Sequence, residues 1–150
     1  MQYLAVILGI LGLDLGIKNH IEKTKTEGID ELRAGGAFII RKHHNKGAFL
    51  NAGENRQRAV MVLSVLLSAV LTAFYVVTLG NAGKGMLKWG LTLLLGGAYS
   101  NTYDRLTRKY VVDYLSFNVP WKWLRRIIFN IGDFCIMIGA LISTLGYYRQ

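Results

Sequence analysis

The sequence predicts an α-helical integral membrane protein with four transmembrane helices and a small extramembrane β-sheet. Of the 150 residues, 52% are hydrophobic and only 18% are charged. The stretch from Ala59 to Gly83 contains no Asp, Glu, Lys or Arg, whereas a helix of a water-soluble protein would need a polar face. The 18 Lys and Arg residues gather between the apolar stretches, as expected for loops at a membrane surface.

The first predicted span covers residues 1–17, which are apolar except for Asp14. A cleaved signal peptide is the alternative, but it would have basic residues before its apolar core and a small-residue cleavage site after it. The chain instead starts Met1-Gln2-Tyr3, and Lys18 follows the apolar stretch directly. We therefore expect a retained transmembrane helix.

Three further spans are predicted at residues 59–79, 86–103 and 127–148, because each is apolar over about the length that crosses a bilayer. A short turn rich in glycine, residues 80–85, joins the first two of these and suits antiparallel neighbours. The span at 86–103 contains several glycines, which let helices approach closely in lipid.

The segment between the first two spans is too polar to lie within the membrane. Residues 28–57 are expected to form an extramembrane β region, with short strands at 37–42 and 47–50 around a turn at 43–46. There is no internal repeat and no low-complexity linker. We therefore expect residues 1–150 to form a single membrane domain.

The formal net charge of +9 would suggest a polyanion such as nucleic acid as the partner of a soluble protein. Here the basic residues cluster in loops and form no stripe along one helix. The sequence therefore predicts membrane lipids as a partner and no nucleic acid. Trp121 and Trp123 are expected to anchor the last loop at the headgroup boundary, and the single Cys135 excludes an intramolecular disulfide.

The three histidines, His20, His43 and His44, do not predict a metal site. Two of them are adjacent in a polar loop, and no Cys or carboxylate set accompanies them at the spacing of a zinc site. The sequence also lacks the motifs of serine hydrolases, zinc peptidases and phosphate-binding loops. We therefore expect no metal and no cofactor.

Ionisable residues at membrane depth are costly and commonly functional. Asp14 and Lys18 are four residues apart on one helix face and are expected to form a structural ion pair. Asp104 ends the third span, and the alternative to a functional role is an ordinary polar helix end. Asp113 follows two valines in a strand-like or re-entrant run, and the alternative to a functional role is a surface position on a strand. Asp133 lies in an otherwise apolar helix. The alternative there is an ordinary solvent-exposed side chain, and of the four aspartates this one fits that alternative least well.

Five short motifs contain these polar residues. In chain order they are Asp14-x-x-x-Lys18, Asn45-Lys46-Gly47-Ala48-Phe49, Gly97-x-x-x-Asn101-x-x-Asp104-Arg105, Val111-Val112-Asp113-Tyr114 and Phe129-Asn130-Ile131-Gly132-Asp133. Each motif alone is weak, but the five together, in this order and at these spacings on four spans, form a strong signal, and the match extends over nearly the whole chain. The chain resembles the prolipoprotein signal peptidases, the signal peptidase II family of intramembrane aspartic proteases.

The resemblance implies an aspartic endopeptidase whose catalytic pair is Asp113 and Asp133. It assigns substrate-binding or supporting positions to Asn45, Asn101, Asp104, Arg105 and Asn130. The implied substrate is a lipoprotein precursor, cut directly before a cysteine that carries diacylglycerol. The resemblance also implies a short helix in an external loop, no cofactor and a monomer.

Two departures from the family pattern are visible. One alanine rather than two precedes Phe49, and Gly132 stands where alanine is common. The family orientation puts the termini in the cytoplasm and the site at the outer face of a bacterial plasma membrane. The positive-inside rule favours the reverse, because every Lys and Arg except Lys84, Lys88 and Arg149 would lie at the outer side. The alternative function is a non-catalytic four-span protein that binds lipid-modified peptides.

Overall fold

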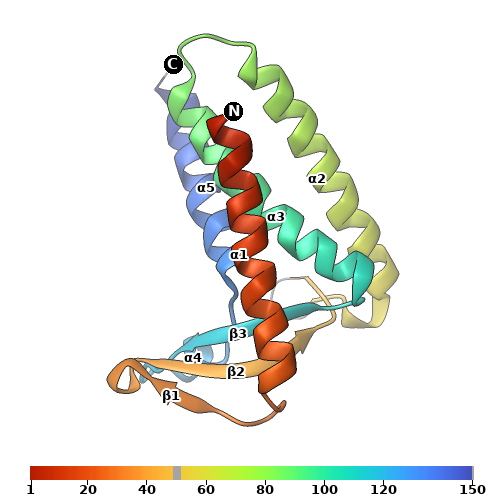
Figure 1. The fold of residues 1–150 in the computed structure, drawn as a ribbon, viewed down its shortest axis with the longest axis vertical. Coiled ribbons are helices and arrows are strands. Elements are labelled where there is room, and N and C mark those ends of the chain that lie inside the picture. Colours follow the sequence, from red (N-terminus) through yellow and green to blue (C-terminus); the bar gives the residue numbers. More distant parts are fainter. Residues whose placement is uncertain (49–51, 150) are drawn as a thin grey trace.

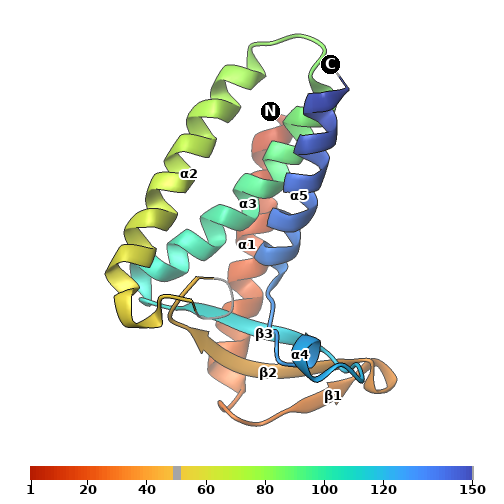
Figure 2. The same cartoon turned by 180° about the vertical axis from the view of Figure 1, so that it is seen from behind.

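The computed structural model describes residues 1–48 and 52–149, in which four long helices stand on a small sheet (Figure 1). The long helices are α1 (Gln2–Thr24), α2 (Gln57–Leu79), α3 (Gly85–Thr107) and α5 (Ile131–Tyr148). Both termini lie at the end of the helices away from the sheet, as the front and back views show (Figures 1 and 2). The mainly helical membrane fold with a small sheet agrees with the class expected from the sequence.

Among the described residues, three helices are long and apolar enough to cross a membrane: Gln2–Thr24, Glu54–Leu79 and Ile131–Tyr148. Helix α3 is equally long but less apolar, because it carries polar side chains that are buried inside the protein, among them Thr92, Ser100 and Asn101. It packs against α1, α2 and α5. Hydropathy therefore supports three spans rather than the four expected, and the remaining long helix lies at the centre of the bundle.

The first helix is longer than expected. The prediction ended it at Ile17, but α1 continues for two further turns, to Thr24. Lys18 does not end the apolar segment, because its ammonium is fully buried against Asp14. Because the charge of Lys18 is compensated by Asp14 on the same helix face, the helix can continue through this position inside the bundle.

Helices α3 and α5 approach closely along a seam of glycines. A Cβ atom on Gly139 would lie 2.5 Å from the backbone nitrogen of Leu94, and one on Gly90 would lie 2.5 Å from the backbone nitrogen of Ser143. Neither position can carry a side chain without moving a backbone. The glycines expected to allow close helix packing therefore have that role here.

Helix α2 is joined to α3 by hydroxyl groups. Ser68 Oγ lies 2.9 Å from Thr102 Oγ1, and Thr72 Oγ1 lies 2.6 Å from the Tyr99 hydroxyl. Both pairs lie between two apolar helices, where hydrogen bonds of this kind favour a fixed register. The contacts place one wall of the cavity described below.

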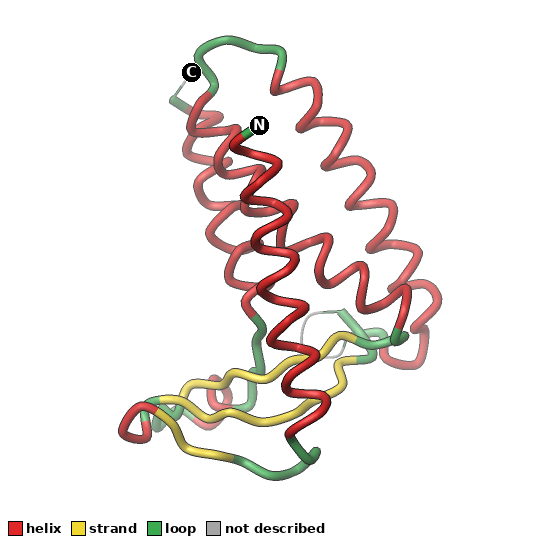
Figure 3. The backbone as a smooth tube through the Cα atoms, viewed as in Figure 1, coloured by secondary structure: helices red, strands yellow, loops and turns green. Residues whose placement is uncertain are grey.

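The sheet contains β1 (Glu31–Arg33), β2 (Phe38–Asn45) and β3 (Val111–Phe117), antiparallel and in that order. Figure 3 shows the strands together, in yellow, at one end of the helices. The expected hairpin is wrong. The residues assigned to its turn, 43–46, mostly belong to β2, which pairs with β3 through His43 opposite Asp113. Long-range pairing to a hydrophobic strand replaces the local turn. Of the second expected strand, residues 47 and 48 lie outside any strand, and 49 and 50 lie outside the described residues.

The strand-like interpretation of the run around Asp113 is confirmed by β3. The last span begins at Ile131 and not at residue 127, because Phe129 instead exchanges backbone hydrogen bonds with Leu115 of β3. A four-residue helix, α4 (Lys122–Arg125), occupies the loop before it. Its flanking and internal tryptophans are exposed, as an anchor at the headgroup boundary requires.

Candidate active site

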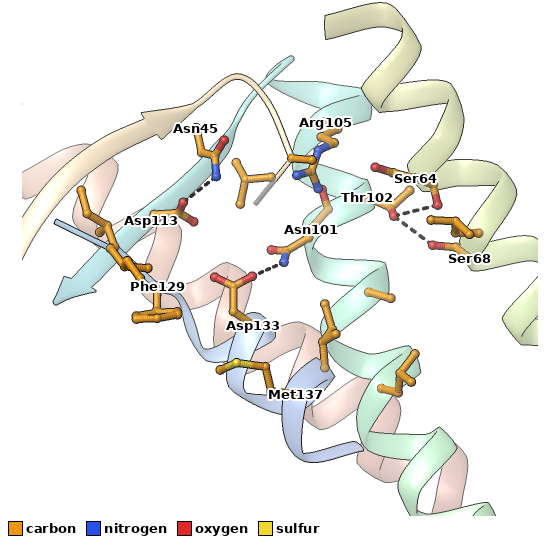
Figure 4. A pocket seen from close by; sticks show the side chains of 18 of the residues that line it. Asn45, Ser64, Ser68, Asn101, Thr102, Arg105, Asp113, Phe129, Asp133 and Met137 are labelled. Carbon is orange, nitrogen blue, oxygen red and sulfur yellow. Dashed lines mark hydrogen bonds between the residues drawn. The ribbon is translucent and has the colours of Figure 1, made fainter. Parts of the chain in front are cut away.

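A cavity of about 540 Å³ opens between the helices and the sheet. Its wall inside the bundle is mainly apolar and includes Leu67, Leu71, Leu94, Ile136 and Met137. Its wall at the sheet is polar and includes Asn45, Asn101, Arg105, Asp113 and Asp133. Figure 4 shows side chains from the sheet, α3 and α5 converging on this cavity. The arrangement suits a ligand with an apolar part and a polar part.

Asp113 lies on β3 and is 2% exposed. Each of its carboxylate oxygens accepts a hydrogen bond from a side-chain amide. Asn130 Nδ2 donates to Oδ1 at 2.7 Å, and Asn45 Nδ2 donates to Oδ2 at 3.0 Å. One amide comes from the start of α5 and the other from β2, so the position of the carboxylate depends on segments far apart in the sequence.

Asp133 lies in the first turn of α5, where Asn130 is the N-cap. The two residues form a reciprocal capping box: Asp133 N–H donates to Asn130 Oδ1 at 2.9 Å, and Asn130 N–H donates to Asp133 Oδ2 at 3.0 Å. Asn101 Nδ2 of α3 donates to the other carboxylate oxygen at 2.8 Å (Figure 4). The capping box that starts the helix thus also holds one of the expected catalytic groups.

The three asparagine amides are oriented by what their oxygens accept. Asn45 Oδ1 accepts from Gly47 N–H at 3.1 Å, and Asn101 Oδ1 accepts from Lys18 Nζ at 2.8 Å. Asn130 Oδ1 accepts from Asp133 N–H, as described above. Because each oxygen is engaged by a donor, each NH₂ group points to a carboxylate. The site therefore presents directed donors to both aspartates.

Neither aspartate has a cation within ion-pair distance among the described residues. Arg105 lines the same cavity but donates to backbone oxygens, to Gly47 O at 3.0 Å and to Asn101 O at 3.3 Å. Burial, and next the negative charge of Asp133, raise the pKa of Asp113 to about 7. A carboxyl group with such a pKa can hold or release a proton near neutral pH.

A second polar cluster lies behind the first, between α1 and α3. Lys18 Nζ is 2.7 Å from Asp14 Oδ2 and 3.4 Å from Asp104 Oδ2, and it donates to Ser100 Oγ at 3.0 Å. Ser100 donates to Asp14 at 2.5 Å. All four side chains are fully buried, so the expected structural ion pair is present as part of a larger cluster. Asp104 is a member of it, and not the ordinary polar helix end that was the alternative.

The family model for signal peptidase (SPase) II matches residues 6–149 of the chain. The chain belongs to the signal peptidase II family. This membership confirms the resemblance that the five motifs indicated, and with it the expectation of a membrane-embedded peptidase.

Curated relatives match the chain over all or nearly all of its length. It is 32% identical to a lipoprotein signal peptidase of Halothermothrix orenii, over 100% of this chain and 97% of the relative. It is 28% identical to that of Clostridium tetani, over 100% and 94%. It is 31% identical to that of Brucella suis, over 97% and 90%. All three relatives are bacterial, which supports a bacterial membrane as the location.

Two solved structures share the fold of the signal peptidase. One is described as a bacterial membrane enzyme at 2.3 Å resolution, with a TM-score of 0.85, 21% identity, and coverage of 99% of this chain and 88% of the other. The second, a bacterial membrane enzyme at 1.9 Å, has a TM-score of 0.80 and 21% identity, covering 97% and 92%. At this identity the likeness concerns the fold.

The structure brings all the site residues expected from the sequence to one end of the signal peptidase's helical bundle. Sequence reasoning assigned no separate role to Ser100, which bridges Lys18 and Asp14, or to Tyr114, whose hydroxyl donates to Asp14. Both lie inside the quoted motifs, and that position was the available signal. His43, which the sequence excluded only as a metal ligand, lines the cavity. Among the described residues no group of three or more His, Cys, Asp and Glu side chains could hold a metal ion.

Proposed function

We propose that Asp113 and Asp133 are the catalytic pair with which this signal peptidase hydrolyses the signal peptide of a lipoprotein precursor. The observation that carries the proposal is that both carboxylates border one cavity and are held by amide donors, with no cation paired to either among the described residues. Carboxylates in this setting can share one proton, whereas a cation partner would keep each of them ionised.

Peptide hydrolysis by two carboxyl groups requires one ionised and one protonated member. The ionised group takes a proton from the attacking water, and the protonated group donates its proton to the carbonyl oxygen. As the tetrahedral intermediate collapses and its C–N bond breaks, the first group gives its proton to the leaving amine, and the second group takes back a proton from a hydroxyl of the intermediate. The raised pKa of Asp113 matches the need for one protonated member near neutral pH, and the pair titrates as a unit.

The remaining site residues support this pair. Asn45, Asn101 and Asn130 hold the carboxylates by directed hydrogen bonds and can contact the peptide backbone of the substrate. Arg105 fixes the loop that follows β2 by binding the oxygen of Gly47. Asp104 acts in the cluster around Lys18 and not in the chemistry.

The proposed substrate carries diacylglycerol on the cysteine that follows the scissile bond. An apolar cavity wall that continues into the bundle suits an apolar signal segment or a lipid chain, and the relatives named above are lipoprotein signal peptidases. We propose that residues 1–150 act as one catalytic unit, as a monomer, in a bacterial plasma membrane.

The substrate proposal is tested with the purified protein in lipid vesicles. Two precursor peptides are compared, one with a diacylglyceryl cysteine and one with an unmodified cysteine, and products are identified by mass spectrometry. We expect cleavage of the lipidated peptide directly before its cysteine and no cleavage of the other. Binding of the lipidated peptide without cleavage would favour the alternative of a non-catalytic protein that binds lipid-modified peptides.

We further propose that the sheet and the catalytic pair face the outer side of the membrane, against the bias of the basic residues. In a Cys135→Ala background, a cysteine in place of Lys122 is expected to react with a membrane-impermeant thiol reagent added to intact cells. A cysteine in place of Lys84, in the α2–α3 connection, is expected to react only after lysis. The reverse pattern would place the dyad in the cytoplasm and contradict the proposed function.

A further inference from the structure

Two side chains at the sheet end of the catalytic cavity take no part in the mechanism described above. They are His43 of β2 and Arg126, the residue that follows α4. Both belong to the lining of the cavity that contains Asp113 and Asp133. Their chemistry, an imidazole and a guanidinium, suits recognition of an anion.

The strand pairing places His43 beside the catalytic pair. His43 is the cross-strand partner of Asp113, and it lies two residues before Asn45, whose amide binds Asp113. Side chains two apart on a strand share a face. The neighbouring His44 lies on the other face, where its Nε2 is 2.7 Å from Glu22 Oε1.

The His43 ring has no hydrogen-bond or ion-pair partner among the residues that the structure describes, and it is only partly buried. Burial lowers its pKa, so the ring is mainly neutral near pH 7 and presents one N–H donor and one acceptor. A donor of this kind can bind a ligand group in the cavity.

Arg126 is an exposed cation whose guanidinium pairs with no carboxylate in residues 1–48 and 52–149. The residue after it, Ile127, is buried, so the backbone that carries Arg126 is held at the cavity wall. The other guanidinium of the lining, that of Arg105, is already engaged by the oxygens of Gly47 and Asn101. Arg126 is therefore available to a ligand.

The two ends of the cavity then correspond to two parts of the substrate. The apolar wall between the helices suits the signal segment, and the chain that follows the cysteine must leave toward the sheet, outside the membrane. We propose that Arg126 and His43 recognise an acidic side chain on the residue directly after the lipidated cysteine. This inference rests on the proposed function, and it adds a preference among lipoprotein precursors.

The test compares three lipidated precursors that differ only at the residue after the cysteine, which is Asp, Ser or Lys. For the unmodified enzyme we expect kcat/KM to be about fivefold higher for the Asp precursor than for the Ser precursor, and lowest for the Lys precursor. A fivefold ratio corresponds to about 1 kcal/mol, the upper end of the range for exposed charge pairs. In Arg126→Gln the ratio of Asp to Ser should fall to about one to twofold. His43→Ala should lower the same ratio by a smaller factor.

Arg125→Gln is the matched control, because Arg125 is an exposed neighbour of the same charge that does not line the cavity. It should leave the ratio unchanged. Equal kcat/KM for the Asp and Ser precursors in the unmodified enzyme would overturn the inference, and so would a ratio that Arg126→Gln leaves unchanged. In both cases, cleavage of the Ser precursor would still support the proposed function. Failure to cleave any of the three would instead contradict the proposed function itself.

A lipid headgroup is the competing source of negative charge. If Arg126→Gln slows all three precursors by the same factor, and only in vesicles that contain phosphatidylglycerol, then Arg126 binds lipid and the inference is wrong. If the discrimination between Asp and Ser persists in vesicles of phosphatidylcholine alone, recognition is by the substrate side chain, as proposed.

Discussion

Two pairs of aspartates lie within this small bundle, and their surroundings differ. Asp14 and Asp104 share the ammonium of Lys18, and the side chain of Arg108 lies 3.1 Å from Asp104. Asp113 and Asp133 have amide donors instead. The first pair is closed from the cavity, whereas the second borders it.

The comparison shows how one bundle assigns different tasks to the same side chain. A buried carboxylate and a buried cation compensate each other's charge, and removal of one leaves the other uncompensated. A carboxylate held by neutral donors beside a second carboxylate can take up a proton instead. The first arrangement is suited to holding helices together and the second to moving protons.

Replacing a member of the open pair should abolish catalysis without unfolding the protein. Asp113→Asn and Asp133→Asn are each expected to lower kcat about 10³-fold or more, because an amide cannot exchange the proton. A precursor gel-shift assay measures the rate, and the control is Asp30→Asn, which changes an exposed aspartate just before β1. Combining both changes should cost little more than either alone, since the pair acts as one unit. Substantial turnover by either single variant would contradict the assignment.

Replacing the cation of the closed cluster should act on stability. Lys18→Met leaves Asp14 and Asp104 buried with reduced compensation, and the expected loss is about 3–5 kcal/mol in the free energy of unfolding. Thermal unfolding in detergent measures it, and Asp113→Asn should show no comparable loss in the same assay. A Lys18→Met protein that unfolds at the temperature of the unmodified one would remove the distinction between the two clusters.

Asn130 should have an intermediate effect, because its side chain donates to Asp113 and accepts from the N–H of Asp133. Asn130→Ala removes one hydrogen bond to a carboxylate and the cap of α5, each worth about 1–3 kcal/mol. We expect kcat/KM to fall about 10- to 100-fold. Asn118→Ala, which removes an amide that donates to Gly36 O in the connection between β1 and β2, is the control and should leave kcat/KM within about twofold.

The pH dependence follows from Asp113. Its pKa of about 7 lies above the value of about 3.9 for an aspartate in an unfolded chain, so the folded protein keeps a proton that the unfolded chain has lost. Its stabilising contribution is complete below about pH 4 and is lost as the pH rises to about 7. Chemical unfolding across this range should show the decline, and Asp113→Asn should not.

The same proton governs activity. Above about pH 7, kcat/KM should fall about tenfold per unit as the pair loses its shared proton. Activity that stays constant to pH 9 would show that no proton with this pKa is needed.

Part of this arrangement is visible in the sequence because it is local. Asp14 and Lys18 are one helical turn apart, and their pairing could be predicted from spacing alone. The run Val111-Val112-Asp113-Tyr114 could likewise be predicted as a strand. The turn expected at 43–46 was wrong because its residues pair with β3, which follows more than sixty residues later in the chain, and such pairing leaves no local signal.

The sequence by itself determined where the apolar helices run, which polar residues interrupt them and, through its motifs, which family the chain belongs to. Hydropathy and helical spacing are properties of neighbouring residues, so they can be seen without the fold. Only the tertiary structure decided that Asp104 also meets the cation of the closed cluster and that, among the described residues, Asp113 and Asp133 pair with none. Lys18 reaches Asp104 across the α1–α3 contact, while Asn130 joins Asp113 to the start of α5. The ionisation of a buried carboxylate depends on what packs around it, and that depends on segments far apart in the chain.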